Sequence, residues 1–244
     1  MDTKTLSPVA AAGYSARPAV VAYLGAAAFI VATAWNALAM HGVTVASAPH
    51  AAANMPADQA MRAYYRWVAT TIGQEQLYSA IAIVGFACLA AVAVLTRQVL
   101  DRDDALARAG AFAVGAGAAT WVVGSLIEFG GHRAIGLMAT HINPIQVTNS
   151  ISFTIDTIVQ AFDLAAFALL SAGMLAFARV AIRRGRRGWA ACTLVLALIG
   201  LLAAWSYAAG NGDFTQAVLL AGGLAAMPAW LIWTARLAPA GSSS

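Results

Sequence analysis

Six long apolar runs, separated by shorter polar stretches, dominate the sequence. They are Pro18–Met40, Glu75–Leu95, Ala107–Phe129, Ile151–Phe177, Gly188–Tyr207 and Thr215–Trp233. A helix needs about 20 apolar residues to cross the roughly 30 Å of hydrocarbon in a bilayer, and each run meets that requirement. The pattern therefore predicts an all-α polytopic membrane protein, a bundle of six transmembrane helices. It divides the chain into a tail over residues 1–17, a single membrane domain over 18–236 and a second tail over 237–244.

The connection between the first two runs is long and has two unlike halves. Residues 42–57 are small and interrupted by proline, which is typical of an irregular segment. Residues 58–72 contain no helix breaker, Asp58 can cap a helix there, and Tyr64 and Trp67 suit the level of the lipid headgroups. We therefore expect an interfacial helix in this first outer loop.

Composition and charge support a membrane protein and indicate its orientation. Only 10% of the residues are charged, against about 25% in a soluble domain. The arginines flank the apolar runs, so the net charge of +4 indicates topology and not nucleic-acid binding. With the N-terminus in the cytoplasm, only Arg62, Arg66 and Arg133 of the 14 basic residues lie outside. The positive-inside rule then predicts cytoplasmic N- and C-termini in a plasma membrane, and the alanine- and arginine-rich composition favours a bacterial inner membrane.

Aromatic residues near the ends of the runs are typical of the belts that mark membrane–water interfaces. This pattern places Trp35, Trp205 and Tyr207 at the outer interface and Trp189, Trp230 and Trp233 at the inner one.

Polar residues gather near the predicted outer ends of the helices. About 20 residues separate Arg108 from Glu128, so Glu128 lies near the outer boundary and His132 one turn further on. The two share a face if the helix continues through Gly130–Gly131, although paired glycines favour a break. Glu75 opens the second run at the same level, and Arg133 is the arginine closest in sequence to this cluster.

The fourth run carries a polar stripe. Asp156, Gln160 and Asp163 are spaced i, i+4 and i+7 and so lie on one helix face. A carboxylate in hydrocarbon is costly, which predicts that this face turns toward the bundle interior. Together with the residues of the third helix, the stripe predicts an outward-facing vestibule lined by acidic and histidine side chains.

Such a vestibule allows several functions, which the sequence leaves open. We expect it to bind a cation or a lipophilic small molecule, in a protein that works alone, as a homo-oligomer or as a subunit of a larger membrane complex. Alternatively, Glu128, His132, His141 and Asp156 could hold copper or zinc, because carboxylate and imidazole donors suit these metals. A third alternative is an intramembrane enzyme that uses Asp163 or Glu128 as the proton donor to a lipophilic substrate. The same side chains could instead be solvated loop groups or structural hydrogen-bonding groups.

Two resemblances add expectations of their own. The segments "DRDDALARAGAF", "FALLSAGMLAFARV" and "RRGRRGWAACTLVLALIGLL" resemble an uncharacterised bacterial six-helix membrane family, which implies this fold and no known activity. Glu75, Glu128, His132 and His141 resemble the metal-site pattern in the C subunit of copper membrane monooxygenases, which implies copper binding at these positions. Here a glutamate replaces that family's aspartate, the spacing to the second histidine is shorter, and "AGNGDF" ends the fifth run without histidine.

Overall fold

The computed structural model describes residues 8–40, 42–43, 55–100, 102–140 and 145–237. These residues form seven α-helices and one π-helical segment, without a β-strand among them. The elements are α1 (Pro8–Met40), α2 (Ala57–Leu100), α3 (Ala105–Thr140), α4 (Ile145–Arg183), α5 (Arg187–Ala208), α6 (Gly212–Ala221), η1 (Gly222–Ala226) and α7 (Met227–Leu237). The predicted all-α class is confirmed.

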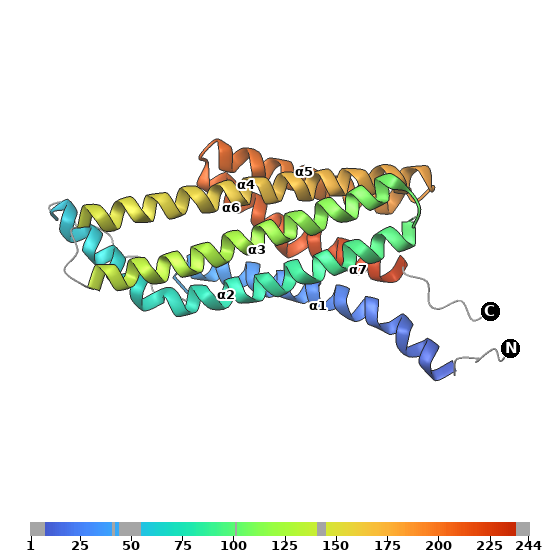
Figure 1. Cartoon of the computed structure of the whole chain (residues 1–244), viewed down its shortest axis with the longest axis horizontal. Helices are drawn as coiled ribbons and strands as arrows, with labels where there is room; N and C mark the ends of the chain where they lie inside the picture. The colour runs from blue at the N-terminus through green and yellow to red at the C-terminus, as the bar shows by residue number, and fades with distance from the viewer. Residues whose placement is uncertain (1–7, 41, 44–54, 101, 141–144, 238–244) are drawn as a thin grey trace.

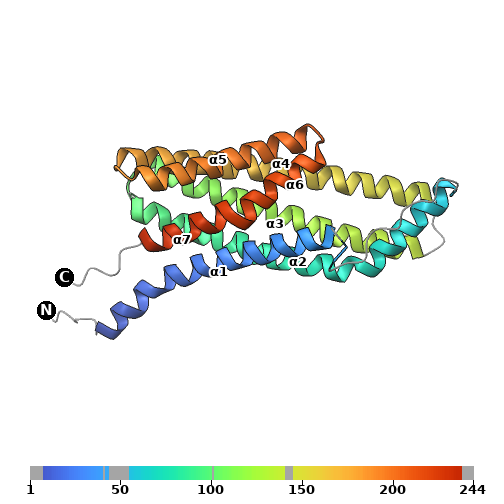
Figure 2. The ribbon, with the colours of Figure 1, turned by 180° about the vertical axis from the view of Figure 1, so that it is seen from behind.

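Six helical segments are long and apolar enough to cross a membrane, as predicted. Five belong to α1, α2, α3, α4 and α5, and the sixth joins α6, η1 and α7 into one span over Gly212–Leu237. The helices lie side by side along the long axis of the molecule (Figure 1, Figure 2). The protein is therefore an integral membrane protein with a single six-helix bundle.

The two ends of this bundle differ. At one end, on the right in Figure 1, α1 begins, α2 connects to α3, α4 turns into α5 and α7 ends. We call this the arginine end, because the helix ends and turns that meet there are rich in arginine. They contain Arg97, Arg102, Arg108, Arg179, Arg183, Arg184, Arg186, Arg187 and Arg236. At the other end, which we call the extended end, α3, α4 and the first half of α2 continue past the turn between α5 and α6 (Figure 1).

The helices at the extended end are longer than the sequence pattern indicated. α3 runs through Gly130–Gly131 without a break and ends at Thr140, not at Phe129, and α4 begins at Ile145 instead of Ile151. At 1.5 Å per residue the 36 residues of α3 span about 54 Å, well beyond the hydrocarbon thickness of about 30 Å. The sequence pattern ended each run where polar residues or the paired glycines interrupt it, so it missed the helical residues beyond.

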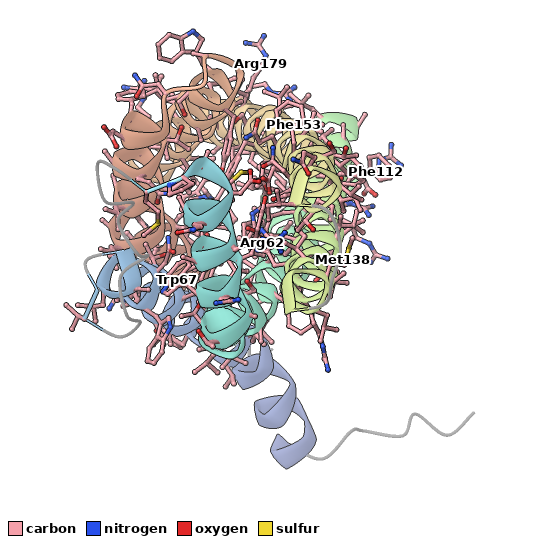
Figure 3. The ribbon with its side chains drawn as sticks, turned by 90° about the vertical axis from the view of Figure 1, so that its left-hand side faces the viewer. Arg62, Trp67, Phe112, Met138, Phe153 and Arg179 are labelled. Carbon is pink, nitrogen blue, oxygen red and sulfur yellow. The ribbon has the colours of Figure 1, made fainter. Side chains whose placement is uncertain are left out.

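The segment predicted to form an interfacial helix is helical and forms the first half of α2, while its position at the membrane interface stays a prediction. α2 has 44 residues, and its candidate membrane span begins only at Leu77. Figure 3, a view onto the extended end, shows this first half, with Arg62 and Trp67, crossing in front of the other helices. It packs there through Tyr65, which is buried with Ile135 and Ile145 and whose hydroxyl donates a hydrogen bond to Asn149 Oδ1 at 3.1 Å.

Helices α3 and α4 pack closely through glycines. Gly110, Gly117, Gly124 and Gly131 recur every seven residues along α3. A Cβ atom added to Gly117 would lie 2.9 Å from the carbonyl oxygen of Ala166, and one added to Gly124 would lie 2.9 Å from Phe162 Cβ. A seven-residue repeat keeps one face of a helix against its neighbour, and small residues there allow close backbone approach.

Helices α5 and α7 are joined by reciprocal hydrogen bonds near the arginine end. Trp189 Nε1 donates to Thr234 Oγ1 and Trp230 Nε1 donates to Thr193 Oγ1, both at 3.0 Å. Both tryptophans are buried, at 2% and 0% exposure. Both indoles therefore pack inside the bundle, and their predicted depth at the inner interface stays a prediction.

Candidate functional site

A cavity of about 440 Å³ lies inside the bundle, toward the extended end. Every membrane-crossing segment contributes to its lining, and Trp67 from the first half of α2 also borders it. A volume of this size is typical of sites for small organic molecules.

Aromatic rings form much of the apolar wall. Phe86 stacks on Trp121 with ring centroids 4.1 Å apart, and Phe29 meets Phe86 edge-on at 5.1 Å. Phe167 stacks on Tyr207 at 6.0 Å on another part of the wall. Such rings present both apolar surface and negative π faces to whatever occupies the cavity.

Two carboxylates from neighbouring helices enter the same cavity. Asp163 is supplied by α4 and Glu128 by α3, and they are close enough to repel each other electrostatically. The hydroxyl of Tyr207, on α5, donates a hydrogen bond to the Asp163 carboxylate. Asp163 on α4 therefore interacts with a side chain from α3 and with one from α5.

Glu128 and His132 share a helix face, as expected if α3 were continuous. The helix passes through Gly130–Gly131, so these side chains are one turn apart, and both line the cavity. A Cβ atom added to Gly131 would lie 2.7 Å from Ile155 Cγ2, whereas Gly130 faces open space. Gly131 thus serves the close packing of α3 on α4, and it does not break the helix.

Only one member of the polar stripe on α4 reaches the cavity. Asp163 lines it, whereas Asp156 and Gln160 are exposed and lie outside the lining, so the prediction that the stripe faces the interior was wrong for these two. The physical reason is the length of α5, which ends at Ala208, one residue beyond the Tyr207 that contacts Asp163. Further along α4 there is no α5 to cover the same face.

The predicted metal donors come together only as a pair. His132 Nε2 lies 3.6 Å from Asp156 Oδ1, and Asp156 is half exposed. Within the described part of the chain, no three histidine, cysteine, aspartate or glutamate side chains gather in a way that could hold a metal ion. His141 lies outside the described residues. The copper or zinc site stays a prediction, and the described donors Glu128, His132 and Asp156 do not support it.

The remaining members of the predicted vestibule contribute little to the described site. Arg133 is exposed and does not line the cavity. Glu75 lies in α2, in a stretch whose side chains are outside the described ones.

Sequence reasoning missed the residues that complete the cavity. Trp35 and Tyr207 were expected in the outer aromatic belt, yet both line the cavity, and Tyr207 binds Asp163. The Phe29–Phe86–Trp121 cluster was not predicted, because aromatic residues in apolar runs serve equally well as packing. The available signal was the polar tip of Tyr207 at the outer end of the fifth apolar run, the end at which the vestibule was predicted.

The fold and the cavity define the chain as a six-helix membrane protein with an acidic, aromatic-lined internal site. Comparisons with family models, with curated proteins and with solved structures found no match. The two family resemblances therefore stay predictions.

Proposed function

We propose that this protein binds a small lipophilic molecule carrying a positive charge, in a cavity that faces the outside of a bacterial inner membrane. One observation carries the proposal: Glu128 and Asp163 enter the same aromatic-lined cavity. The outward orientation rests on the positive-inside rule, which assigns the arginine end to the cytoplasm.

Charge favours a cation over other ligands. No lysine or arginine is found among the described residues that line the cavity, whereas two carboxylates are. These carboxylates would repel an anionic ligand and attract a cationic one.

The walls favour an organic cation over a hydrated metal ion. A cation placed over the face of Trp121 or of a neighbouring phenylalanine gains cation–π attraction, about 2 kcal/mol when the contact is desolvated. The apolar part of the ligand would displace water from the same rings. Metal ions instead need several converging donors, and the described residues offer none of that kind.

The acidic anchor is already oriented. Tyr207 packs on Phe167 and donates its hydrogen bond to Asp163, so the carboxylate is held at the cavity wall before a ligand arrives. Less conformational freedom is then lost on binding, which strengthens affinity.

A binding experiment with charge-matched probes tests this proposal. The purified protein in lipid nanodiscs, with a chelator present, is dialysed against benzyltrimethylammonium, benzyl alcohol or benzenesulfonate. We expect saturable binding of the ammonium alone, and Asp163→Asn should weaken it about tenfold or more, or at least about 1.4 kcal/mol. Asp156→Asn, an exposed acid on the same helix, is the control and should bind as the wild type does. Equal binding of all three probes, or equal loss in both variants, would contradict the proposal.

A further inference from the structure

The polar and apolar residues that line the cavity are separated along its length. On each membrane-crossing segment, the lining residue nearest the arginine end is apolar or aromatic. These six residues, which we call the floor, are Phe29, Phe86, Trp121, Met174, Leu196 and Met227. Each segment also contributes a polar or charged lining residue nearer the extended end. This second set comprises Asn36, Tyr78, Glu128, Asp163, Tyr207 and Gln216.

The distance between the two sets follows from helix geometry. On α4, Met174 lies eleven residues beyond Asp163, and on α5, Leu196 lies eleven residues before Tyr207. The two helices run in opposite directions, and the hydrogen bond from Tyr207 to Asp163 joins their polar positions. At 1.5 Å per residue, both helices therefore place the floor about 16 Å from that hydrogen bond. The cavity is elongated along the helices, with its charge at one end.

The floor suits an apolar group and not a second charge. Phe29, Phe86 and Trp121 are in ring contact there and are nearly buried. The described floor residues include no charged side chain. A charged group placed among them would lose its hydration without gaining an opposite charge, whereas a hydrocarbon chain would gain by leaving water.

We infer that the ligand is a single-chain cationic amphiphile, which places its charged group near Asp163 and extends its apolar chain to the floor. This inference rests on the proposed function, because it names the class of organic cation that the same cavity takes. It adds that the two ends of the ligand are unlike. A compact cation would leave the floor unused, and a ligand charged at both ends would bring one charge into it.

A chain-length series tests whether the apolar chain reaches the floor. Butyl-, hexyl- and octyltrimethylammonium are dialysed against the protein in lipid nanodiscs. Affinities refer to the free aqueous concentration, and binding to empty nanodiscs is subtracted. Because each methylene on the chain is removed from water, affinity should rise about fourfold per added methylene from butyl to octyl.

A second probe separates an amphiphile site from simple attraction by two carboxylates. Octane-1,8-bis(trimethylammonium) has the same eight-carbon chain as octyltrimethylammonium and a charge at each end. Its second charge would lie at the floor, so we expect it to bind at least about tenfold more weakly than the singly charged probe. Attraction by the carboxylates alone predicts the opposite order, because the bis-ammonium carries twice the charge.

Two leucines on α5 provide a matched pair of variants. Leu196 belongs to the floor, whereas Leu198 is 56% exposed and lies outside the cavity lining. Leu196→Phe should shorten the cavity and lower the ratio of octyl to butyl affinity about tenfold, whereas Leu198→Phe should keep the wild-type ratio. Size-exclusion profiles and thermal unfolding identify a variant that fails to fold, and the comparisons between probes on the wild type need no variant.

The outcomes separate the inference from the proposed function. If none of these cations and no benzyltrimethylammonium binds, the proposed function is overturned. If the cations bind with an affinity that does not depend on chain length, or if the bis-ammonium binds as tightly as the octyl probe, the proposed function stands and the amphiphile inference fails. It also fails if a folded Leu196→Phe keeps the wild-type ratio of octyl to butyl affinity.

Discussion

Asp156 and Asp163 are the same residue type on one helix face, yet they have different surroundings. They are seven residues apart, about 20° apart around the helix axis and about 10 Å apart along it. Asp163 meets Tyr207 at the end of α5, whereas Asp156 is half exposed and lies beside His132. The chemistry available to each aspartate is therefore set by where α5 ends, and not by its own position in the α4 sequence.

A third aspartate, Asp104, has a structural role at the arginine end. Its Oδ1 accepts hydrogen bonds from the backbone N–H groups of Leu106 at 2.7 Å and Ala107 at 3.1 Å, which caps the start of α3. Its Oδ2 lies 2.9 Å from Arg183 Nη2 at the end of α4. One side chain thus begins α3 and ties it to α4.

The capping role of Asp104 predicts an acid-dependent loss of stability. The backbone N–H of Ala107, followed by that of Leu106 and by the Arg183 charge, lowers the pKa of Asp104 below its ordinary value. A carboxyl whose pKa is lower in the folded state stabilises that state above its unfolded-state pKa, about 4, and loses this contribution as the pH falls through the folded-state value. The Tm of the wild type should therefore fall between pH 5 and pH 3 by more than the Tm of Asp104→Asn, which keeps a cap but cannot titrate.

The Asp213→Asn variant, which changes an exposed aspartate at the start of α6, is the control for this comparison and should show the wild-type acid loss. Thermal unfolding followed by circular dichroism in nanodiscs measures all three proteins. If Tm depends on pH identically in the wild type and in Asp104→Asn, the proposed contribution of the Asp104 carboxylate to stability is contradicted.

At the scale of elements, the contact between α3 and α4 depends on backbone proximity. The glycines at positions 110, 117, 124 and 131 place α3 against α4 over most of its length, and this contact sets Glu128 beside Asp163. A side chain added to this face would separate the helices, because the atoms that it would meet include main-chain atoms that cannot rotate away.

Two glycines on α3 provide a matched test of this contact. A Cβ atom in Gly117→Ala would meet the Ala166 carbonyl oxygen at 2.9 Å and Leu170 N at 3.0 Å, so we expect destabilisation by about 1–3 kcal/mol. Gly115→Ala makes the same change two residues away, where nothing lies within 4 Å, and should be neutral or slightly stabilising. Thermal unfolding of the two variants decides the matter, and equal stability would show that the close contact is not required.

The six spans could be predicted from the sequence because hydropathy reports directly on lipid burial. The same reasoning missed the extensions of α3 and α4, because polar residues and the paired glycines interrupt the apolar pattern there although the helices continue. It assigned Glu128, His132 and Asp163 to one vestibule, and these three line the cavity. It could not place Asp156 or Tyr207 correctly, because depth along a helix does not specify which neighbouring helix covers a given face.

At the scale of the whole molecule, the two ends of the bundle differ along its long axis. The arginine end carries most of the basic residues, whereas the extended end carries the first half of α2 and the polar parts of α3 and α4 (Figure 1, Figure 3). Six crossings place the start of α1 and the end of α7 on the same side. The cavity lies toward the opposite side. The orientation of the protein in the membrane therefore decides from which side a ligand can reach the cavity.

Two exposed positions at opposite ends of α5 test the orientation. With Cys88 and Cys192 replaced by alanine, single cysteines are introduced as Arg184→Cys in the α4–α5 turn and Asp213→Cys at the start of α6. A membrane-impermeant maleimide should label position 213 in intact cells and position 184 only after permeabilisation. The reverse labelling pattern would place the arginine end outside and contradict the proposed outward cavity.

The most direct test of the account is to locate a bound cation. A crystal structure with 4-iodobenzyltrimethylammonium would place the ligand by the anomalous signal of its iodine. The account predicts one strong peak inside the cavity beside the Phe86–Trp121 pair, with the ammonium group within about 5 Å of the Asp163 or Glu128 carboxylate, a distance at which opposite charges attract strongly. Iodine peaks confined to the lipid-facing surface, with the cavity free of ligand at saturating concentration, would contradict it.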